Sequence, residues 1–387
     1  MEKSGEIECH ILVIFSGNMP TVDLVMNLMM SFARDNNCQI RKKITDYVKA
    51  DDILWADTIL AIRPYDVGAI DIITAAKKNG KCVIAYLDDD LLNVPDLYAS
   101  LPRMLIAKLL KRKNQKALKN CLSMCDVLWG SNPILLERYE EYVKSGRCVR
   151  CDVVADISQM KAVDVETEYP HILFAGGGDH AELLNRYIIP ALNQIENKFP
   201  KLKMTCMGVN KIQLNECRVP IRFIPWNNNY EEYRKMIEKG NYHIGIAVIE
   251  EDEFFQCKYF NKFIEYSKLG AVGIYTDSAP YNLIVRHREN GFLAKSTVDS
   301  WAENIKYAIE NPQLCIECVE NAQKLIREDF NQEKLISKMI DVMPELCESH
   351  GIHEGKISYR QRLIWSLCKK MGMAVIEMYE RCISKVG

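Results

Sequence analysis

Short apolar runs alternate with helical patterns in two separate series along this sequence. The first series has runs typical of buried strands at residues 11–15, 58–62, 82–87 and 127–129. The second series has comparable runs at residues 172–175, 203–207, 221–224, 243–249 and 271–275. Alternation of strands and helices favours a parallel sheet with helices on both faces. The sequence therefore predicts an α/β fold with two Rossmann-like domains.

The two series meet in an acidic segment without a clear period, near residues 155–169. A length of 387 residues suits two ordinary domains. We expect residues 1–165 to form an N-terminal domain, residues 166–335 a C-terminal domain and residues 336–387 a helical tail. Ligands of such sheets bind beyond the carboxyl ends of the strands, so we expect a site in the cleft between the two parallel sheets.

Two helices are predicted near the end of the second series. Residues 301–310 carry an apolar stripe that we expect to face the core, formed by Trp301, Ile305, Ala308 and Ile309. A further helix is expected over residues 332–347.

Composition limits the class of protein. Hydrophobic residues make up 48% and charged residues 26%, which is typical of a globular protein in water. The formal net charge of −2 argues against a nucleic-acid partner, because such proteins usually carry a basic excess. The polar N-terminus is unlike a signal peptide, and no apolar run approaches the roughly 18 residues of a membrane span. We therefore expect a cytoplasmic protein.

Three charged residues in the second half stand at helical spacing. Lys258, Lys262 and Glu265 are four and three positions apart, which would place them on one polar face of a helix. A carboxylate there could accept both hydroxyls of a ribose, and the ammonium groups could offset the charge of a diphosphate. The alternative is a set of helix ion pairs worth a few tenths of a kcal/mol.

The setting of these charges resembles the nucleotide-binding half of GT-B glycosyltransferases. It follows the order of the retaining glycosyltransferase group 1 family, whose members include sucrose synthase-like and mannosyltransferase-like enzymes. That order is an apolar strand, an acidic loop, K-x-x-x-K-x-x-E-Y, a glycine, a second strand and N-G-x-L. The matching positions here are Lys258, Lys262, Glu265, Tyr266, Gly270, Asn290, Gly291 and Leu293. The resemblance covers residues 172–330 well and the N-terminal half more loosely.

The resemblance implies a GT-B fold and sugar transfer from a nucleotide-sugar donor. It also implies that the anomeric configuration of the sugar is retained and that neither a metal nor another cofactor is needed. It implies that Glu265 binds the donor ribose and Lys258 the diphosphate, while Lys262 supports the phosphate or orients Glu265. Two positions depart from the pattern. Cys257 stands where the family often has a second glutamate, and Val272 stands where it usually has a proline. Loss of that glutamate puts the sugar half of the donor site in doubt.

A glycine triplet follows the first strand of the second series and opens a helix: Gly176, Gly177 and Gly178. Such backbone presents N–H groups to an anion, and the structural alternative is a tight capped turn. His180, beside it, could reach the donor. By the same resemblance Trp226 borders the nucleobase, unless it only plugs a loop onto the core, and Tyr281 belongs to the donor side.

The first domain is expected to supply the acceptor side. Gly17 and Asn18 follow its first strand. Asp88, Asp89 and Asp90 end another strand, and such a triplet could hold a divalent ion against a diphosphate. That interpretation conflicts with the two-sheet organisation, so we favour contact with the acceptor or a structural cap on the following helix.

Residues 356–387 have seven basic and two acidic residues, a net charge of +5. Apolar and aromatic residues accompany them, as in a helix that lies in an anionic membrane interface. The alternative is a terminal helix that packs on the first domain. A membrane surface would suit a lipid-linked or cell-surface glycan acceptor.

These features favour a glycosyltransferase of polysaccharide or surface-glycan synthesis. The alternative is a catalytically silent GT-B-like protein that binds a nucleotide or glycan, or that pairs with an active partner. A sugar-nucleotide epimerase of the same fold is a third candidate. The nucleobase, the sugar and the acceptor stay open at this point.

Overall fold

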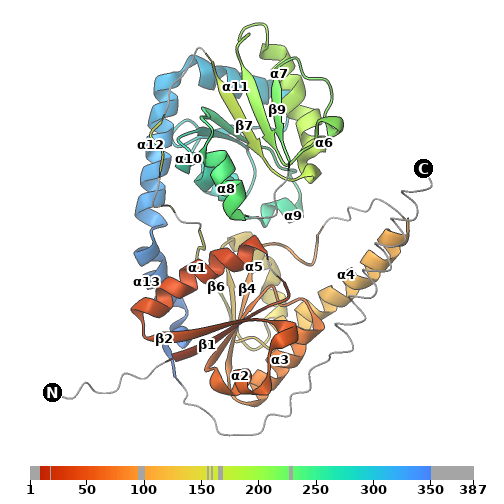
Figure 1. Cartoon of the computed structure of the whole chain (residues 1–387), viewed down its shortest axis with the longest axis vertical. Coiled ribbons are helices and arrows are strands. Elements are labelled where there is room, and N and C mark those ends of the chain that lie inside the picture. The colour runs from red at the N-terminus through yellow and green to blue at the C-terminus, as the bar shows by residue number, and fades with distance from the viewer. Residues whose placement is uncertain are drawn as a thin grey trace, which may run out of the picture. The chain divides into compact units, whose positions relative to one another are not determined.

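The computed structural model describes residues 9–17, 19–94, 101–154, 157, 160–163, 169–225 and 230–349. The chain divides into two compact units, the first comprising Met1–Val153 and Leu335–Gly387 and the second Val154–Lys334. Each unit contains one six-stranded sheet covered by helices on both faces (Figure 1). The candidate residues Asn18 and Trp226 and the basic tail at residues 356–387 lie outside the described residues.

The first sheet has the strand order β2-β1-β3-β4-β5-β6, with every neighbouring pair parallel. Its strands are β1 (Cys9–Phe15), β2 (Cys38–Ile44), β3 (Thr58–Ile62), β4 (Cys82–Leu87), β5 (Val127–Gly130) and β6 (Arg147–Arg150). All residues of β3, β4 and β5 are buried, as expected for strands covered on both faces.

The helices of the first unit connect these strands. They are α1 (Pro20–Asp35), α2 (Ala50–Trp55), α3 (Val67–Lys78), α4 (Leu101–Leu122) and α5 (Pro133–Tyr139), with short 3₁₀ turns at η1 (Thr45–Tyr47) and η2 (Glu140–Tyr142). After the second unit the chain forms α13 (Gln332–Val342) and η7 (Pro344–Cys347). The prediction of one helix over residues 332–347 is therefore wrong, because Pro344 cannot donate the hydrogen bond that would continue the α-helix.

The second sheet has the order β12-β11-β10-β7-β8-β9 and is also parallel throughout. Its strands are β7 (His171–Ala175), β8 (Lys203–Met207), β9 (Ile221–Ile224), β10 (Ile244–Ala247), β11 (Val272–Thr276) and β12 (Phe292–Ala294). The central strand β7 pairs with β10 on one side and β8 on the other, so the strand order reverses there. Such a reversal marks the usual ligand-binding edge of a doubly wound sheet.

Helices of the second unit surround this sheet. They are α6 (Ala181–Leu183), a π-helical segment η4 (Leu184–Ile188), α7 (Ile189–Ile195), α8 (Tyr230–Glu238), α9 (Glu253–Gln256), α10 (Asn261–Lys268), α11 (Val298–Glu310) and α12 (Pro312–Asp329). Short 3₁₀ turns form η3 (Gly178–His180), η5 (Lys211–Gln213) and η6 (Tyr281–Leu283). The predicted stripe on α11 is confirmed, since its four apolar residues are all buried.

The predicted α/β class is confirmed, and all nine predicted strands are present within a few residues of their expected ends. The three strands missed by the sequence patterns are β2, β6 and β12, and each lies at the edge of a sheet. No helix among the described residues is long and apolar enough to cross a membrane.

Candidate functional site

The carboxyl edge of the second sheet carries most of the residues predicted for the donor side. β10 ends at Ala247, and the chain then forms two short helices, α9 and α10. Asp252 caps α9, because its side chain accepts a hydrogen bond from the amide of Phe255 at 2.8 Å. The charged segment is therefore built on two helices that follow one central strand.

Lys258 lies in the turn between these helices, so the prediction that it shares one helix face with Lys262 and Glu265 is wrong. Its amide donates to the carbonyl of Phe255 at 3.1 Å, and α10 begins only three residues later. The backbone of Phe260 leaves the helical region there, with ψ at 41°. The apolar spacing could not reveal this break, because the buried residues on its two sides keep a helical period.

The break sets the position of Lys258. Its ammonium lies over the rings of Phe254 and Phe255, 5.0 Å from each centroid. The ring of Phe255 is 5.8 Å from that of His180. His180 also has Nδ1 3.1 Å from the carbonyl oxygen of Val248. Lys258 and His180 therefore belong to one aromatic patch at the carboxyl edge of the sheet.

The glycine loop borders the same patch. A Cβ added at Gly176 would lie 3.3 Å from the ring of His180, and one added at Gly178 would lie 3.1 Å from the amide of Gln213. Gly177 has extended backbone and precedes η3. The small size of Gly176 and Gly178 thus permits close packing, and the structure brings the predicted loop, His180 and Lys258 together.

Lys262, Glu265 and Tyr233 form a second cluster. Nζ of Lys262 lies 2.9 and 3.0 Å from the two carboxylate oxygens of Glu265. The hydroxyl of Tyr233 donates to Glu265 at 2.7 Å and accepts from Lys262 at 2.9 Å. The side chains of Lys262 and Glu265 are 24% and 18% exposed, so this pair is less screened than an ordinary surface ion pair.

Sequence reasoning missed Tyr233. It lies on α8, 32 positions from Glu265, so no local spacing links the two residues. The ammonium of Lys262 is also 5.4 Å from the centroid of its ring. The one available signal was the position of α8, which follows the loop that we expected to border the nucleobase.

Tyr266 anchors α10 to β10. Its ring is fully buried, and its hydroxyl donates to the carbonyl of Ile246 at 2.7 Å. The ring packs so closely on Gly245 that an added Cβ there would overlap it. This contact turns Tyr266 toward the sheet and leaves the preceding residue, Glu265, at the carboxyl edge.

We expect Gly245→Ala to destabilise the protein by about 1–3 kcal/mol, because a methyl group has no space beneath the ring of Tyr266. Thermal unfolding should show a lower Tm. Gly17→Ala is the matched control, since an added Cβ at Gly17 would meet nothing within 4 Å. An unchanged Tm for Gly245→Ala would contradict the role of this contact.

The remaining glycine positions of the motif have structural roles. Gly270 has φ of +75°, and an added Cβ would lie 2.5 Å from the carbonyl oxygen of Ala162. The side chain of Asn290 accepts from the amide of Arg286 at 2.7 Å and so closes the loop before Gly291. Gly291 has φ of +156°. These residues shape the framework that positions Glu265.

Two other positions that the resemblance places near the donor are buried. Cys257 is fully buried, so its thiol is not part of the surface that carries Lys258. Tyr281 is 5% exposed and packs 4.8 Å from the ring of Tyr275. Burial raises the pKa of Tyr281, and the charge of Glu265 raises it further. Tyr281 therefore lies in the core behind Glu265.

In the first unit, Asp88 and Asp89 follow β4 and are held by Arg63. The guanidinium donates to Asp88 at 2.5 Å and to Asp89 at 2.6 Å. Thr21 donates to the other oxygen of Asp88 at 2.5 Å. Burial lowers the pKa of Arg63, but the two carboxylates raise it by more, so the net pKa lies above its ordinary value. The side chains of Asp88 and Asp89 stay 20% and 27% exposed.

Asp90 is fully buried and points in a different direction. Its carboxylate accepts from the hydroxyl of Tyr139 at 2.8 Å, from Arg138 at 3.0 Å and from the side-chain amide of Asn93 at 2.9 Å. These contacts tie the loop after β4 to α5.

Among the described residues, no group of three or more His, Cys, Asp or Glu side chains could hold a metal ion.

Gly17 is half-buried after β1, in the same unit as the aspartates. The residues predicted for the acceptor side therefore belong to the first unit, and the described residues predicted for the donor side all belong to the second.

Solved structures with this architecture are known. The chain is similar to sucrose-phosphate synthase from Thermosynechococcus elongatus, with a TM-score of 0.60, 10% identity and coverage of 87% of this chain and 99% of that one. It is similar to Anabaena HepE in complex with UDP and glucose, with a TM-score of 0.59, 11% identity and coverage of 87% and 99%. Staphylococcus aureus TarM gives a TM-score of 0.52 at 11% identity, with coverage of 75% and 55%.

These likenesses establish the GT-B fold, as the resemblance implied. At 10–11% identity they extend to the fold alone. The sequence matches no protein-family model and no curated protein.

Proposed function

We propose that this protein is a glycosyltransferase that moves a sugar from a nucleotide-sugar donor to a glycan or lipid-linked acceptor. The observation that carries the proposal is the partly shielded Lys262–Glu265–Tyr233 cluster at the carboxyl edge of a Rossmann-like sheet. The GT-B fold supports it, because the similar structures of HepE and TarM are complexes with UDP.

In this proposal Glu265 accepts hydrogen bonds from the ribose hydroxyls of the donor. Its carboxylate is already a double acceptor, from Tyr233 and Lys262, so it can exchange those bonds for the two hydroxyls of a diol. Lys262 would then stay close enough to compensate the charge.

Lys258 and the glycine loop serve the diphosphate. The ammonium of Lys258 and the N–H groups of Gly177 and Gly178 would stabilise the negative charge that develops on the leaving nucleoside diphosphate, whereas the N–H of Gly176 is donated to the carbonyl of Met207 at 3.1 Å. This chemistry needs no metal, and the nucleotide sugar is the only co-substrate. A retaining outcome is proposed from the family resemblance.

Acceptor binding is assigned to the first unit, through Gly17, Asn18 and the aspartates after β4. The side chains of Asp88 and Asp89 stay partly exposed while Arg63 holds them, so they can accept further hydrogen bonds from sugar hydroxyls. We propose a polysaccharide or surface glycan as acceptor, and the net charge of +5 in residues 356–387 supports reaction at a membrane surface.

The second candidate is a silent GT-B-like binding protein. The burial of Cys257 favours it, because a buried thiol stands where the family often has its second glutamate and offers no carboxylate to the donor sugar. Under this alternative a nucleotide or glycan would bind without turnover.

Thermal shift against UDP, GDP, ADP and CMP tests the donor site. A ligand at 100 times its Kd adds about 2.7 kcal/mol to the unfolding free energy, so one nucleotide should raise the Tm clearly. The variant Lys258→Ala should lose most of that rise, and Lys306→Ala, an exposed lysine on α11, should keep it. If no nucleotide shifts the Tm of the wild-type protein, both candidate functions lose their basis in this site.

A further inference from the structure

The helix α4 carries a concentrated positive charge. Its 22 residues include seven basic and no acidic ones: Arg103, Lys108, Lys111, Arg112, Lys113, Lys116 and Lys119. The whole chain has a net charge of −2, so with +7 on α4 the remaining residues carry −9. The charge of α4 is therefore opposite to that of the rest of the chain.

Four of these residues form one exposed stripe. Lys108, Arg112 and Lys116 are four positions apart and Lys119 follows three positions later, so they lie on the same side of the helix. All four side chains are exposed, while the opposite face at residues 117–118 and 121–122 is buried. At 1.5 Å per residue the stripe is roughly 16 Å long.

The stripe does not stabilise its own helix. Like charges four positions apart destabilise a helix by a few tenths of a kcal/mol for each pair. Within the part of the chain that the structure describes, Lys108, Arg112 and Lys116 form no ion pair. A stripe that costs stability and is not neutralised by described neighbours suits an external polyanion.

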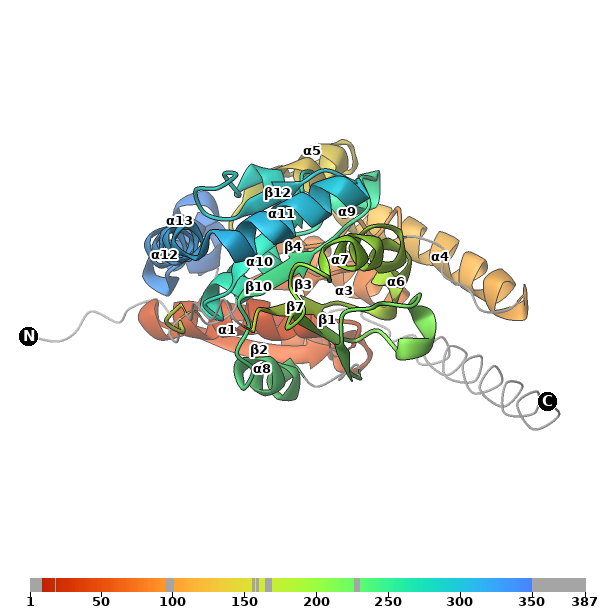
Figure 2. The same ribbon diagram turned by 90° about the horizontal axis from the view of Figure 1, so that it is seen from above.

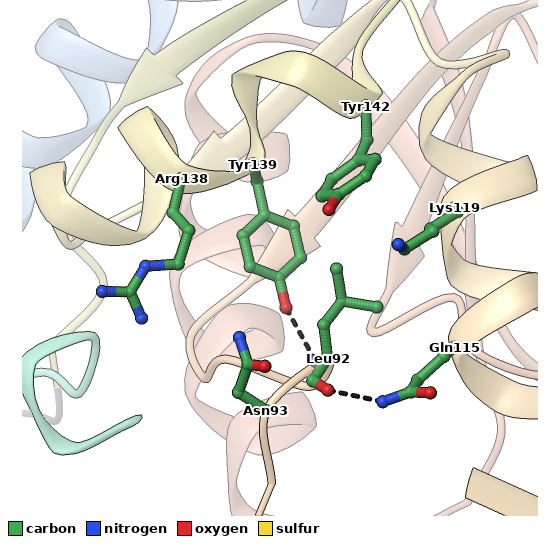
Figure 3. Close-up of a pocket in the computed structure, with 7 residues that line it drawn as sticks. All are labelled: Leu92, Asn93, Gln115, Lys119, Arg138, Tyr139 and Tyr142. Carbon is green, nitrogen blue, oxygen red and sulfur yellow. Dashed lines mark hydrogen bonds between the residues drawn. The ribbon is translucent and has the colours of Figure 1, made fainter. Parts of the chain in front are cut away.

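A pocket lies at the carboxyl end of this stripe (Figure 3). It has a volume of about 200 Å³ and is lined by Leu92, Asn93, Gln115, Lys119, Arg138, Tyr139 and Tyr142. Lys119 belongs to both features, and its ammonium lies 4.5 Å from the ring centroid of Tyr142. The backbone of Leu92 is held on one side by the hydroxyl of Tyr139 at 2.9 Å and on the other by Gln115 at 2.5 Å.

The lining of the pocket favours a small anion. It includes two cations, Lys119 and Arg138, and no carboxylate; because the buried Asp90 pairs with Arg138 at 3.0 Å, the net positive charge of the pocket is that of Lys119. Its volume is below the 300–1,000 Å³ of typical pockets for drug-sized ligands. A phosphate with a short polar substituent matches this size and charge.

Apolar residues on α4 distinguish the class of polyanion. Leu109 is 67% exposed beside Lys108, and six of the first ten residues in the sequence of α4 are Leu, Met or Ile. Figures 1 and 2 show α4 reaching beyond the sheet of its own unit. Cations together with exposed leucine are typical of helices at a lipid interface, whereas a nucleic-acid backbone gains little from leucine.

We propose that the exposed face of α4 docks on the surface of an anionic lipid bilayer, and that the pocket receives the phosphate of one lipid headgroup. The docking surface consists of Lys108, Leu109, Arg112, Lys116 and Lys119. It lies on α4, apart from the basic segment at residues 356–387, and it does not depend on the proposed transferase activity.

Vesicle co-sedimentation of the full-length protein tests the docking surface. The wild-type protein should bind vesicles of phosphatidylcholine mixed with phosphatidylglycerol, bind vesicles of phosphatidylcholine alone far less, and dissociate as salt is added. Each cation near an anionic surface is worth about a fivefold change in partitioning, so Lys108→Gln/Arg112→Gln/Lys116→Gln should lower it roughly 100-fold.

A second triple variant controls for net charge. Arg286→Gln/Lys306→Gln/Lys324→Gln removes three exposed cations from the second unit and should bind vesicles like the wild-type protein. Equal binding by the α4 triple variant and the wild type would assign binding to another part of the chain and overturn the proposal. Stronger binding to duplex DNA than to anionic vesicles would also overturn it.

The pocket is tested separately through Lys119. Lys119→Gln should lower vesicle binding clearly more than Lys108→Gln, because it removes a headgroup contact as well as a surface charge. Glycerol phosphate should inhibit vesicle binding by the wild-type protein more strongly than vesicle binding by Lys119→Gln. If Lys119→Gln and Lys108→Gln bind vesicles equally well and glycerol phosphate inhibits vesicle binding by neither the variants nor the wild-type protein, the headgroup site is refuted. If glycerol phosphate binds while vesicles do not, the ligand is a soluble phosphate and bilayer docking is refuted.

Discussion

Replacing Glu265 with glutamine should lower kcat/KM for the nucleotide sugar by roughly 100-fold. The substitution keeps the size of the side chain, so Tyr266 should still hold α10 on β10. It removes the charge that would strengthen two hydrogen bonds from the ribose, each worth about 1.5–3 kcal/mol for a charged acceptor. It also leaves the ammonium of Lys262 without its carboxylate.

Steady-state kinetics with the donor identified by thermal shift would measure this effect. Glu320→Gln, an exposed glutamate on α12, is the matched control and should behave like the wild-type protein. An unchanged kcat/KM for Glu265→Gln would remove Glu265 from the donor site. If the wild-type protein binds a nucleotide but turns over no donor, the silent alternative is the better account.

Replacing Asp90 with alanine should destabilise the first unit by about 3 kcal/mol. Asp90 is fully buried, and its removal takes away an acceptor of the hydroxyl of Tyr139 and of the guanidinium of Arg138. Loss of one partner of a buried ion pair costs about 3–5 kcal/mol, and we take the lower end because Arg138 is 26% exposed.

Denaturant unfolding would detect this loss as a lower transition midpoint with an unchanged slope. Asp35→Ala, at an exposed position at the end of α1, should change stability by less than about 0.5 kcal/mol. If Asp90→Ala is as stable as the control but no longer transfers sugar to the acceptor, Asp90 contacts the substrate and the structural role proposed for Asp90 is wrong.

The central strands of both sheets were predictable because they are buried on both faces. Such strands are continuous apolar runs, as in β3 and β4, and these runs contrast with the helices between them. The edge strand β2 has the sequence CQIRKKI and is exposed at several positions, so its pattern does not differ from that of a polar loop. β6 and β12 also lie at sheet edges, and they are too short to show a clear apolar run.

The ion pairs in the two candidate sites also differ in whether the sequence could predict them. Lys262 and Glu265 are three residues apart on one helix, so their pairing could be predicted from spacing. Arg63 meets Asp88 and Asp89 from a position 25 and 26 residues away, after a neighbouring parallel strand. Parallel strands bring distant positions to one edge, and sequence spacing carries no record of which ones meet.

The sequence by itself determined the α/β class, the two sheets, the core-facing residues of α11 and the segment that resembles a donor site. All of these depend on burial patterns or on neighbours within one helix. Only the tertiary structure decided that Lys258 stands in a turn and that Tyr233 completes the Glu265 cluster. It alone decided that Cys257 is buried and that α4 presents a stripe of unneutralised charge, because these features depend on which distant side chains share a surface.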